Sequence, residues 1–213
     1  MQKKTNIKSE LKIIGGEFKS RKILFNSNNN SPHKIRPTPN RLRETLFNWL
    51  MHDIKNSHCI DLFAGSGILG FEAISRGAMS VLAYEINSDS INNIKKNRET
   101  LNIKSNKYKI INQNCLEIFK PENFINNKNN TIIFCDPPFN SDLLIKFCDL
   151  ISDLTSKLIC EHNDIYNNFL IYIECPAKLN NEQNKAMKKL NINWKLHKEK
   201  KCADVHGLLF SKK

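Results

Sequence analysis

Two short stretches carry residue types that could do chemistry, and each one directly follows an apolar run. In the first stretch, Asp61 ends the apolar run, and glycines follow at Gly65, Gly67 and Gly70. In the second stretch, an apolar run leads into Asp136-Pro137-Pro138-Phe139. Glycines let a ligand approach the backbone where a Cβ atom would block it. The second stretch offers hydrogen-bond acceptors and an aromatic ring on a turn that two prolines make rigid.

The glycine spacing by itself is compatible with several ligands. Gly65, Gly67 and Gly70 match the pattern G-x-G-x-x-G of nicotinamide and flavin sites. Asp61 lies four residues before Gly65, where a carboxylate suits an ammonium or hydroxyl group better than a pyrophosphate. S-adenosylmethionine carries an ammonium group and has no phosphate. A tight turn whose glycines serve only packing is the alternative.

A second acidic residue, Glu85, lies about twenty residues after the glycines. In a strand–helix–strand unit this is the spacing at which a carboxylate binds the two hydroxyls of a ribose. The pair of features is therefore more specific than either one alone.

Alternating strands and helices are expected to position these residues. Apolar runs predict strands at 57–63, 80–85, 108–112, 131–135 and 169–174, and helical periodicity predicts helices at 68–75, 88–101, 143–154 and 180–190. Such alternation is typical of an α/β fold with a parallel sheet, in which both stretches lie at the carboxyl edge. Residues 194–199 and 205–210 alternate like a terminal antiparallel pair.

The first 35 residues are expected to form a small β appendage and a loop, ahead of a main domain at 36–213. Residues 11–16 are an apolar run ending in a glycine turn, residues 17–25 alternate like a hairpin partner, and residues 26–31 are polar. A helix is expected after Arg36-Pro37-Thr38-Pro39, with Thr38 as its N-cap and Pro39 in its first turn.

The charge of the chain points to a polyanionic partner. The 213 residues carry a net charge of +12, with basic residues concentrated before Met51 and after Ala177. Nucleic acid is the first candidate, and a solvated lysine-rich surface is the alternative. The side chains expected to contact phosphates are Arg21, Lys22, Arg36, Arg41 and Arg43.

Cysteine usage and hydropathy exclude other classes. The seven cysteines include no C-x-x-C pair and no histidine spacing that would build a zinc site, so no metal is expected. They are expected to be buried thiols in a reducing compartment. No apolar run is long enough to span a bilayer, and we expect a cytoplasmic monomer without membrane contact.

Taken together, these residues resemble the class I S-adenosylmethionine-dependent methyltransferases, in which the tetrad D-P-P-F belongs to enzymes that act on exocyclic amines. The chain is most similar to the RsmD family, which methylates N2 of one guanine in bacterial 16S ribosomal RNA. The similarity extends over nearly the whole chain. It rests on residues 13–16, 21–22, 36–38, 41–50, 62–67 and 198–200.

The resemblance implies a Rossmann-like class I methyltransferase fold, with a mostly parallel seven-stranded sheet and a C-terminal antiparallel hairpin. It implies S-adenosylmethionine as cofactor and 16S ribosomal RNA as partner, within the small subunit or its assembly intermediate. The implied cofactor site comprises Thr38, Asp61, Phe63, Gly65, Gly67, Glu85, Ile86, Asn114 and Cys115. The implied catalytic residues that hold the target base are Asp136, Pro137, Pro138 and Phe139.

Two positions depart from the pattern of relatives. Many relatives in the wider superfamily carry aspartate where Asn114 stands, which leaves open the group that binds the adenine amine. The family's usual R-G-R-K is Lys19-Ser20-Arg21-Lys22 in this chain.

Other functions stay open from the sequence. An amine methyltransferase acting on adenine N6 or on a protein glutamine is the nearest alternative, although such relatives generally begin the tetrad with asparagine and end it with tyrosine. A nicotinamide oxidoreductase would leave Asp61 and the tetrad unexplained. A non-enzymatic RNA-binding domain would be expected to lose the tetrad or the glycines.

Overall fold

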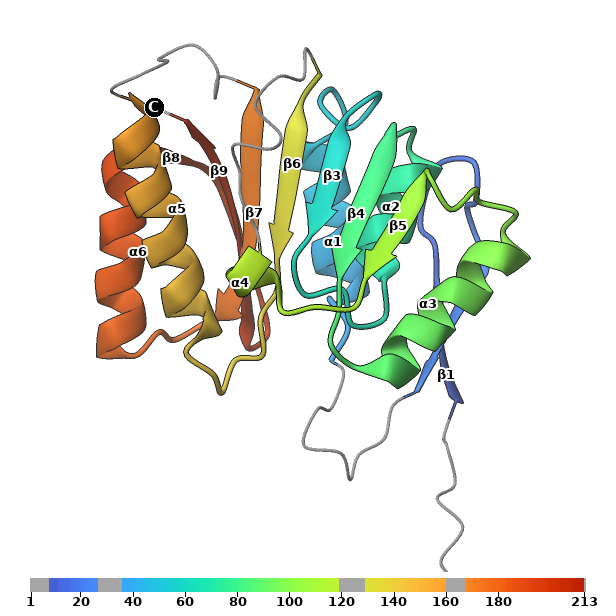
Figure 1. The fold of residues 1–213 in the computed structure, drawn as a ribbon. Coiled ribbons are helices and arrows are strands. Elements are labelled where there is room, and N and C mark those ends of the chain that lie inside the picture. The colour runs from blue at the N-terminus through green and yellow to red at the C-terminus, as the bar shows by residue number, and fades with distance from the viewer. Residues whose placement is uncertain (1–7, 27–35, 119–128, 160–167, 213) are drawn as a thin grey trace, which may run out of the picture.

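The computed structural model describes residues 8–26, 36–118, 129–159 and 168–212 of the chain (Figure 1). Its centre is a seven-stranded sheet with the order β5-β4-β3-β6-β7-β9-β8. The five strands from β5 to β7 are parallel, and β9 pairs antiparallel with both β7 and β8. The predicted α/β fold with its terminal hairpin is confirmed. The strands are β3 (His58–Asp61), β4 (Ser80–Tyr84), β5 (Tyr108–Ile111), β6 (Thr131–Cys135), β7 (Phe169–Pro176), β8 (Trp194–Cys202) and β9 (Val205–Lys212).

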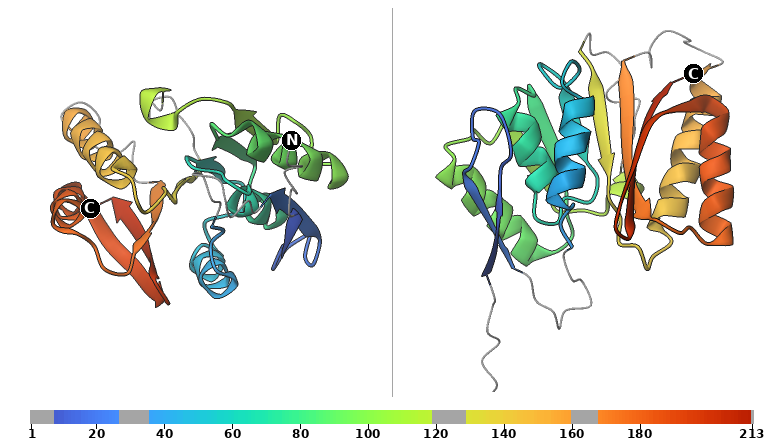
Figure 2. Two further views of the ribbon diagram at one scale, coloured as in Figure 1. Left: turned by 90° about the horizontal axis from the view of Figure 1, so that it is seen from below. Right: turned by 180° about the vertical axis from the view of Figure 1, so that it is seen from behind.

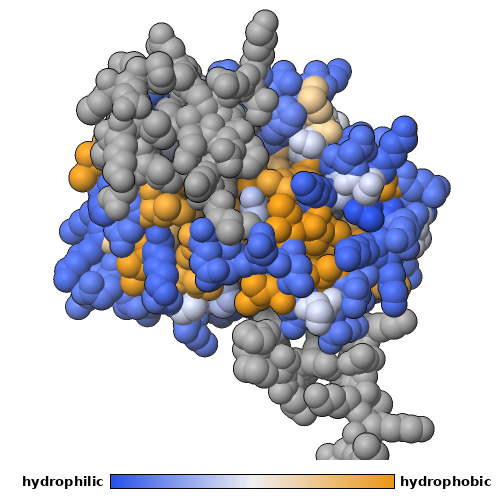
Figure 3. Space-filling view, in the orientation of Figure 1, coloured by the Kyte–Doolittle hydropathy of each residue, from blue (hydrophilic) through white to orange (hydrophobic). Residues whose placement is uncertain are grey.

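Helices cover both faces of this sheet and bury two apolar clusters (Figures 1 and 2). One cluster joins the sheet to α1 (Asn40–Trp49), α2 (Ile68–Ser75) and α3 (Ser88–Thr100). The other joins it to α5 (Leu143–Ile159), α6 (Asn181–Asn193) and the single turn α4 (Cys115–Ile118). Figure 3 shows hydrophobic side chains at the surface in the middle of the view of Figure 1.

Local sequence explains where several elements begin. The Asn87 side chain accepts a hydrogen bond from the Ser90 N–H at the start of α3, and Asn180 forms a capping box with Gln183 at the start of α6. All five residues of β6 are buried, as expected for a central strand covered on both faces.

The N-terminal hairpin is confirmed, but its turn is not the tight glycine turn that the sequence indicated. The strands are β1 (Lys8–Lys12) and β2 (Lys22–Asn26), and residues 13–21 connect them. The backbone N–H groups of Ile14, Glu17 and Phe18 donate to Glu72 Oε1, the Ser75 carbonyl and Ser75 Oγ. These three N–H groups therefore bond to α2 and not to the opposite strand of the hairpin. Residues 27–31 of the expected loop lie outside the described residues, and the domain boundary at residue 35 stays a prediction.

The expected cap of α1 is wrong in one respect. Pro39 is the N-cap residue, and no side chain caps this helix. The Thr38 side chain is instead directed to two carboxyl groups at the sheet edge, which are described below.

The part of the chain that the structure describes contains no helix long and apolar enough to cross a membrane. Within the same ranges, no group of three or more metal-binding side chains is found. Five of the six described cysteines are buried, and Cys202 is half-buried.

Candidate functional site

Three acidic side chains lie at or near the carboxyl ends of three adjacent strands of the sheet. Asp61 is the last residue of β3 and lies opposite Phe134 of β6, two residues before Asp136. On the other side of β6, Cys135 lies opposite Ile173 of β7, so Asp136 and Glu174 follow in parallel. The sheet topology therefore gathers carboxyl groups where the crevice of an open α/β sheet binds its ligands.

Asp61 is an uncompensated buried carboxyl group. Its side chain is 1% exposed, and neither carboxylate oxygen has a hydrogen-bond partner among the described residues. Burial raises the pKa of Asp61 to about 7, and Glu85 adds to this rise, while the nearby Phe63 backbone N–H opposes it. A buried carboxylate without a partner is costly, so this position favours a cationic ligand group.

The glycine turn and Glu85 form one connected structure beside Asp61. Gly65 and Gly67 have φ angles of 52° and 76°, which L residues with side chains rarely adopt. The Glu85 Oε2 atom accepts a hydrogen bond of 2.7 Å from the Gly65 N–H, and its Oε1 atom accepts from the Ile86 and Asn87 N–H groups. The structure thus brings together Asp61, the glycines and Glu85, as the sequence predicted. Next to them, Phe63 is half-buried and Ile86 is 63% exposed.

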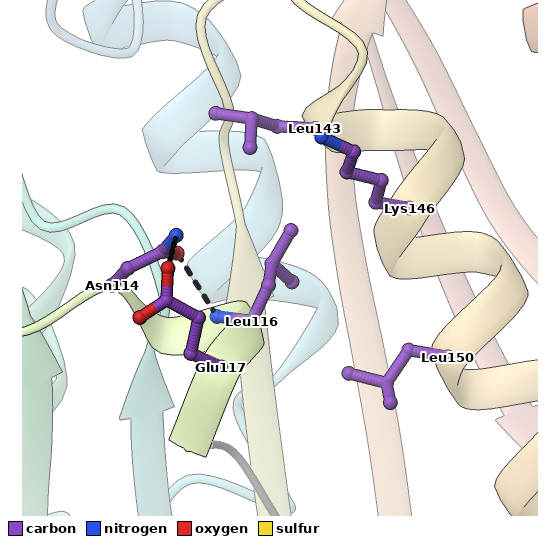
Figure 4. Close-up of a pocket in the computed structure, with 6 residues that line it drawn as sticks. All are labelled: Asn114, Leu116, Glu117, Leu143, Lys146 and Leu150. Carbon is purple, nitrogen blue, oxygen red and sulfur yellow. Dashed lines mark hydrogen bonds between the residues drawn. The ribbon is translucent and has the colours of Figure 1, made fainter.

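A cavity of about 350 Å³ lies between α4 and α5 (Figure 4). Asn114 and Glu117 line one side of it, and Leu143, Lys146 and Leu150 of α5 line the other. The Asn114 Nδ2 group donates to Glu117 Oε1 at 2.9 Å, and Asn114 Oδ1 accepts from the Leu116 N–H at 3.2 Å.

Asn114 thus uses one N–H and one lone pair of its side-chain amide within the protein. Cys115 is 2% exposed, and burial raises the pKa of its thiol to about 12, so the thiol stays neutral at physiological pH.

The tetrad forms a turn directly after β6. The Ser141 Oγ–H donates to the Pro138 carbonyl at 2.6 Å, and the Ser141 N–H donates to the same carbonyl at 3.2 Å. Pro137 is buried, Pro138 is exposed and Phe139 is half-buried. The Arg36 guanidinium lies 5.7 Å from the centre of the Phe139 ring, within the range of a cation–π contact. A flat face and a positive charge therefore meet at this turn.

Asp136 and Glu174 share one hydroxyl group, that of Thr38. The Thr38 side chain hydrogen-bonds to both carboxyl groups, and the Tyr172 hydroxyl donates to Glu174 Oε1 at 3.1 Å. One threonine hydroxyl has one proton to donate, so both bonds form together only when one carboxyl group is protonated.

The pKa values of both carboxyl groups are raised. Burial raises the pKa of Asp136 well above its usual range, and Glu174 and Asp61 raise it further, while Arg36 and Thr38 oppose. Burial likewise raises the pKa of Glu174 to about 7.

Sequence reasoning gave Glu174 no functional role, although the available signal was the same as for Asp61: an acidic residue at the end of an apolar strand. Glu174 is 1% exposed and lies within this carboxyl group cluster. Thr38, expected at the cofactor, lies at the tetrad in this structure.

The expected phosphate contact of Arg43 is wrong. Its side chain is fully buried between α1 and α2, where its Nε atom lies 3.2 Å from Glu72 Oε1. Its Nη2 group donates to the Lys12 carbonyl and to Asn40 Oδ1. This guanidinium joins three segments of the fold and is not available to an RNA.

Arg21 and Lys22 are exposed but lie away from the tetrad. The Arg21 guanidinium donates to the Thr100 carbonyl at the last residue of α3, a helix that runs from the carboxyl edge back to the amino edge. Lys22 pairs with Glu10 at 3.0 Å. The prediction that both lie on the tetrad side of the sheet is wrong. Arg36 and Arg41 are exposed, and Arg36 lies beside the tetrad.

Comparison with known proteins gives one consistent result. A family model described as Conserved hypothetical protein 95 matches residues 11–211. The Haemophilus influenzae protein named Ribosomal RNA small subunit methyltransferase D is 39% identical over 206 residues, which cover 96% of this chain and 95% of that protein. The Escherichia coli K12 protein of the same name is 33% identical over 203 residues, which cover 95% and 90%.

A solved structure is similar as well. The Escherichia coli protein yhhF, described as a proposed methyltransferase, superposes with a TM-score of 0.69 at 31% identity. The match covers 96% of this chain and 99% of that one.

Proposed function

Because the chain belongs to the RsmD family, we propose that it transfers a methyl group from S-adenosylmethionine to the N2 amine of a guanine in 16S ribosomal RNA. The observation that carries this proposal is the position of the tetrad. Asp136 lies one strand away from Asp61, and Arg36 covers the Phe139 ring. A site for a cationic cofactor and a site for a flat base are therefore adjacent on one sheet edge.

The residues present fit S-adenosylmethionine. The buried Asp61 carboxylate has unpartnered oxygens that suit the ammonium group of the methionine moiety. Glu85 lies at the end of β4, where it suits the ribose hydroxyls, and the glycine turn leaves room for close approach. When bound, this cofactor supplies an electrophilic methyl group on a sulfonium.

The cavity between α4 and α5 suits the adenine ring, because leucine side chains line it together with a few polar groups. The Asn114 oxygen accepts from the Leu116 N–H, so Asn114 is poorly placed to accept from the adenine amine. We assign that task to Glu117, whose Oε1 atom accepts from Asn114 and whose second oxygen serves the ligand.

The tetrad would prepare the guanine amine for attack. The N2 lone pair is delocalised into the ring, so the amine is a poor nucleophile until acceptors hold its hydrogens. The Asp136 carboxylate and the Pro137 carbonyl are such acceptors, and neither proline brings a competing N–H. Phe139 would stack on the base, beside the Arg36 guanidinium that lies 5.7 Å from the centre of its ring. Positioning is the main contribution of these residues.

The amine must also lose a proton during the transfer. Asp136 lies beside Glu174, and the Thr38 hydroxyl connects the two carboxyl groups. We assign the acceptance of this proton to Asp136, with Glu174 as the positioning residue that sets its pKa.

The proposed function is tested by incubating the protein with labelled S-adenosylmethionine and small ribosomal subunits from a strain that lacks the enzyme. Label on N2 of a single guanine in 16S RNA is the expected result. Label on an adenine or on protein would overturn the guanine assignment. Naked 16S RNA is assayed in parallel, because the assembled subunit presents different surfaces.

A further inference from the structure

Strand β8 carries a row of lysines that the candidate site does not use. β8 is an edge strand of the sheet, and its residues Lys195 and Lys198 are exposed, while Lys200 is half-buried. Within the described ranges, no ion pair involves any of these three lysines. Their charges are therefore free to meet a ligand.

The register places these lysines on one face of the sheet, the face that α1 covers. Lys198 lies opposite Leu209, which belongs to the same apolar cluster as Leu46 and Phe47 of α1. Lys200 lies opposite Gly207, where an added Cβ atom would come within 2.9 Å of the Leu42 side chain of α1. Paired residues on neighbouring strands share a face. Lys195 lies opposite Ser211, two residues from Leu209 on β9, and an irregularity in β8 between Leu196 and Lys198 places it on the same face.

The one acidic residue in this part of β8 points the other way. Glu199 lies opposite Leu208, a residue of the second apolar cluster, and pairs with His206 at 3.0 Å. The α1 side of β8 thus carries three lysines and no acid, while Glu199 and Lys201 lie on the opposite side.

This positive row begins at the tetrad. Lys200 lies opposite Gly207, and Gly207 lies opposite Glu174, so the three residues form a row across adjacent strands. Two strand spacings make roughly 10 Å between the backbones of Lys200 and Glu174. Arg36 lies between the β8–β9 turn and the tetrad. Its guanidinium is 3.9 Å from Asp204 in that turn and also contacts the Phe139 ring. Figure 2 shows α1 and the β8–β9 hairpin on this rear side of the molecule.

We propose that the α1 side of β8, with Lys195, Lys198 and Lys200 together with the exposed Arg41 of α1, binds backbone phosphates of the RNA next to the target guanine. This inference rests on the proposed function and extends it to the surface that holds the substrate. Phosphates repeat along a strand of RNA, and a row of unpaired lysines that leads away from the tetrad matches this repeat. The N-terminal hairpin, at the opposite edge, takes no part in this contact.

The other role for such lysines is to protect an exposed edge strand from pairing with other chains. The opposite edge strand of the sheet, β5, supplies a matched control. Lys104 and Lys109 are exposed and Lys107 is half-buried on or just before β5, which reproduces the exposure of the three β8 lysines. Both triple variants to glutamine remove three positive charges from an edge of the same sheet.

The experiment measures the affinity of each triple variant for 16S RNA between low and moderate salt. We expect Lys195→Gln/Lys198→Gln/Lys200→Gln to lower the slope of log affinity against log salt by about 2 to 3, at 0.7 to 0.9 for each phosphate contact. The control Lys104→Gln/Lys107→Gln/Lys109→Gln should keep the slope of the wild type. Calorimetry with S-adenosylmethionine should give the same cofactor affinity for all three proteins.

Two results would overturn the proposal. Equal slopes for both triple variants would show that the β8 lysines act only through net charge. A β8 variant that aggregates but binds RNA with the wild-type slope would show that the lysines only protect the strand edge. Failure of the proposed function is distinguishable, because the wild type itself would then neither bind nor methylate the ribosomal RNA.

Discussion

The Nε atom of Arg43 lies 3.2 Å from the Oε1 atom of Glu72, and neither side chain is exposed to solvent. Burial lowers the pKa of the Arg43 guanidinium and raises the pKa of the Glu72 carboxyl, while each group opposes the shift of the other. Glu72 also accepts the Ile14 N–H and pairs with Arg76. The pair therefore holds α1, α2 and the N-terminal segment together.

Removing one partner of this pair should destabilise the fold. Arg43→Met leaves the Glu72 carboxylate buried with less compensation, and we expect a loss of about 3 to 5 kcal/mol in the free energy of unfolding. Arg43→Met with Glu72→Gln should recover part of the loss, because the amide is neutral and still accepts the Ile14 N–H. Urea titrations of the two variants measure this. If Arg43→Met were as stable as the wild type, the structural role of the Arg43–Glu72 pair would be contradicted.

Asp61→Asn should change stability and cofactor binding in opposite directions. The folded-state pKa of about 7 lies above the ordinary value of 3.8, so the folded protein holds the Asp61 proton more tightly than the unfolded chain does. The bound proton contributes to the free energy of unfolding. This contribution is fully present below about pH 4 and is lost as the pH rises to about 7. The neutral asparagine avoids that loss and should be more stable than the wild type at pH 8, by on the order of 3 kcal/mol.

The same variant loses the charge that we assign to the cofactor ammonium, so its affinity for S-adenosylmethionine should fall by roughly 2 kcal/mol. Urea unfolding at pH 4.5 and pH 8, together with calorimetry, tests both effects. A stability difference that does not depend on pH would show that Asp61 is not an uncompensated buried acid.

Asp136→Asn tests the recognition of the base. The guanine edge presents N1–H and N2–H₂ as donors, and a carboxylate only accepts, whereas an amide both accepts and donates. We expect methyl transfer to fall by on the order of a hundredfold, the scale of one lost polar contact in a transition state. Single-turnover transfer at saturating cofactor and RNA measures it, and unchanged cofactor affinity is the control. Near-normal transfer would exclude the carboxylate as the guanine acceptor.

Glu174→Gln should shift the pH dependence of transfer. Asp136 can take up the proton of the amine only when it is ionised, so the rate should increase as the pH rises through the pKa of Asp136. After burial, the neighbouring Glu174 charge is the largest cause that raises this pKa. Removing that charge lowers the pKa of Asp136 and should move the rising limb of the pH profile to lower pH.

If Glu174 had only a structural role, the variant would have a lower methyl-transfer rate at every pH, and the rising limb of the pH profile would stay at the same pH. Tyr172→Phe is the control for packing, because it keeps the ring and removes only the hydroxyl that donates to Glu174. The methyl-transfer rate measured from pH 5 to pH 9 gives the profiles of the three proteins.

Hydrophobic periodicity predicted the bounds of α2 and β6 correctly, because their neighbouring glycines and prolines end each element sharply. It could not predict the burial of Arg43, because a hydrophobic pattern assigns every charged residue to the solvent-exposed face. Its partner Glu72 lies on a different helix, and no local spacing connects the two. Alternation predicted the terminal antiparallel pair, but only the register with β9 tells which lysines of β8 share the side of α1.

The order of contacts along the chain has a consequence for synthesis on the ribosome. Strands β1 and β2 are complete at residue 26, but the Leu24 backbone bonds to Asn97, and the Ile14 and Glu17 N–H groups bond to Glu72 and Ser75. A nascent chain that has not yet exposed residue 97 has no partner for the Leu24 backbone, and one that has not exposed residues 72 to 75 also lacks the partners of Ile14 and Glu17. The hairpin that comes first in translation is therefore fixed late, and an N-terminal fragment ending before α3 would keep its first strands open to chaperones.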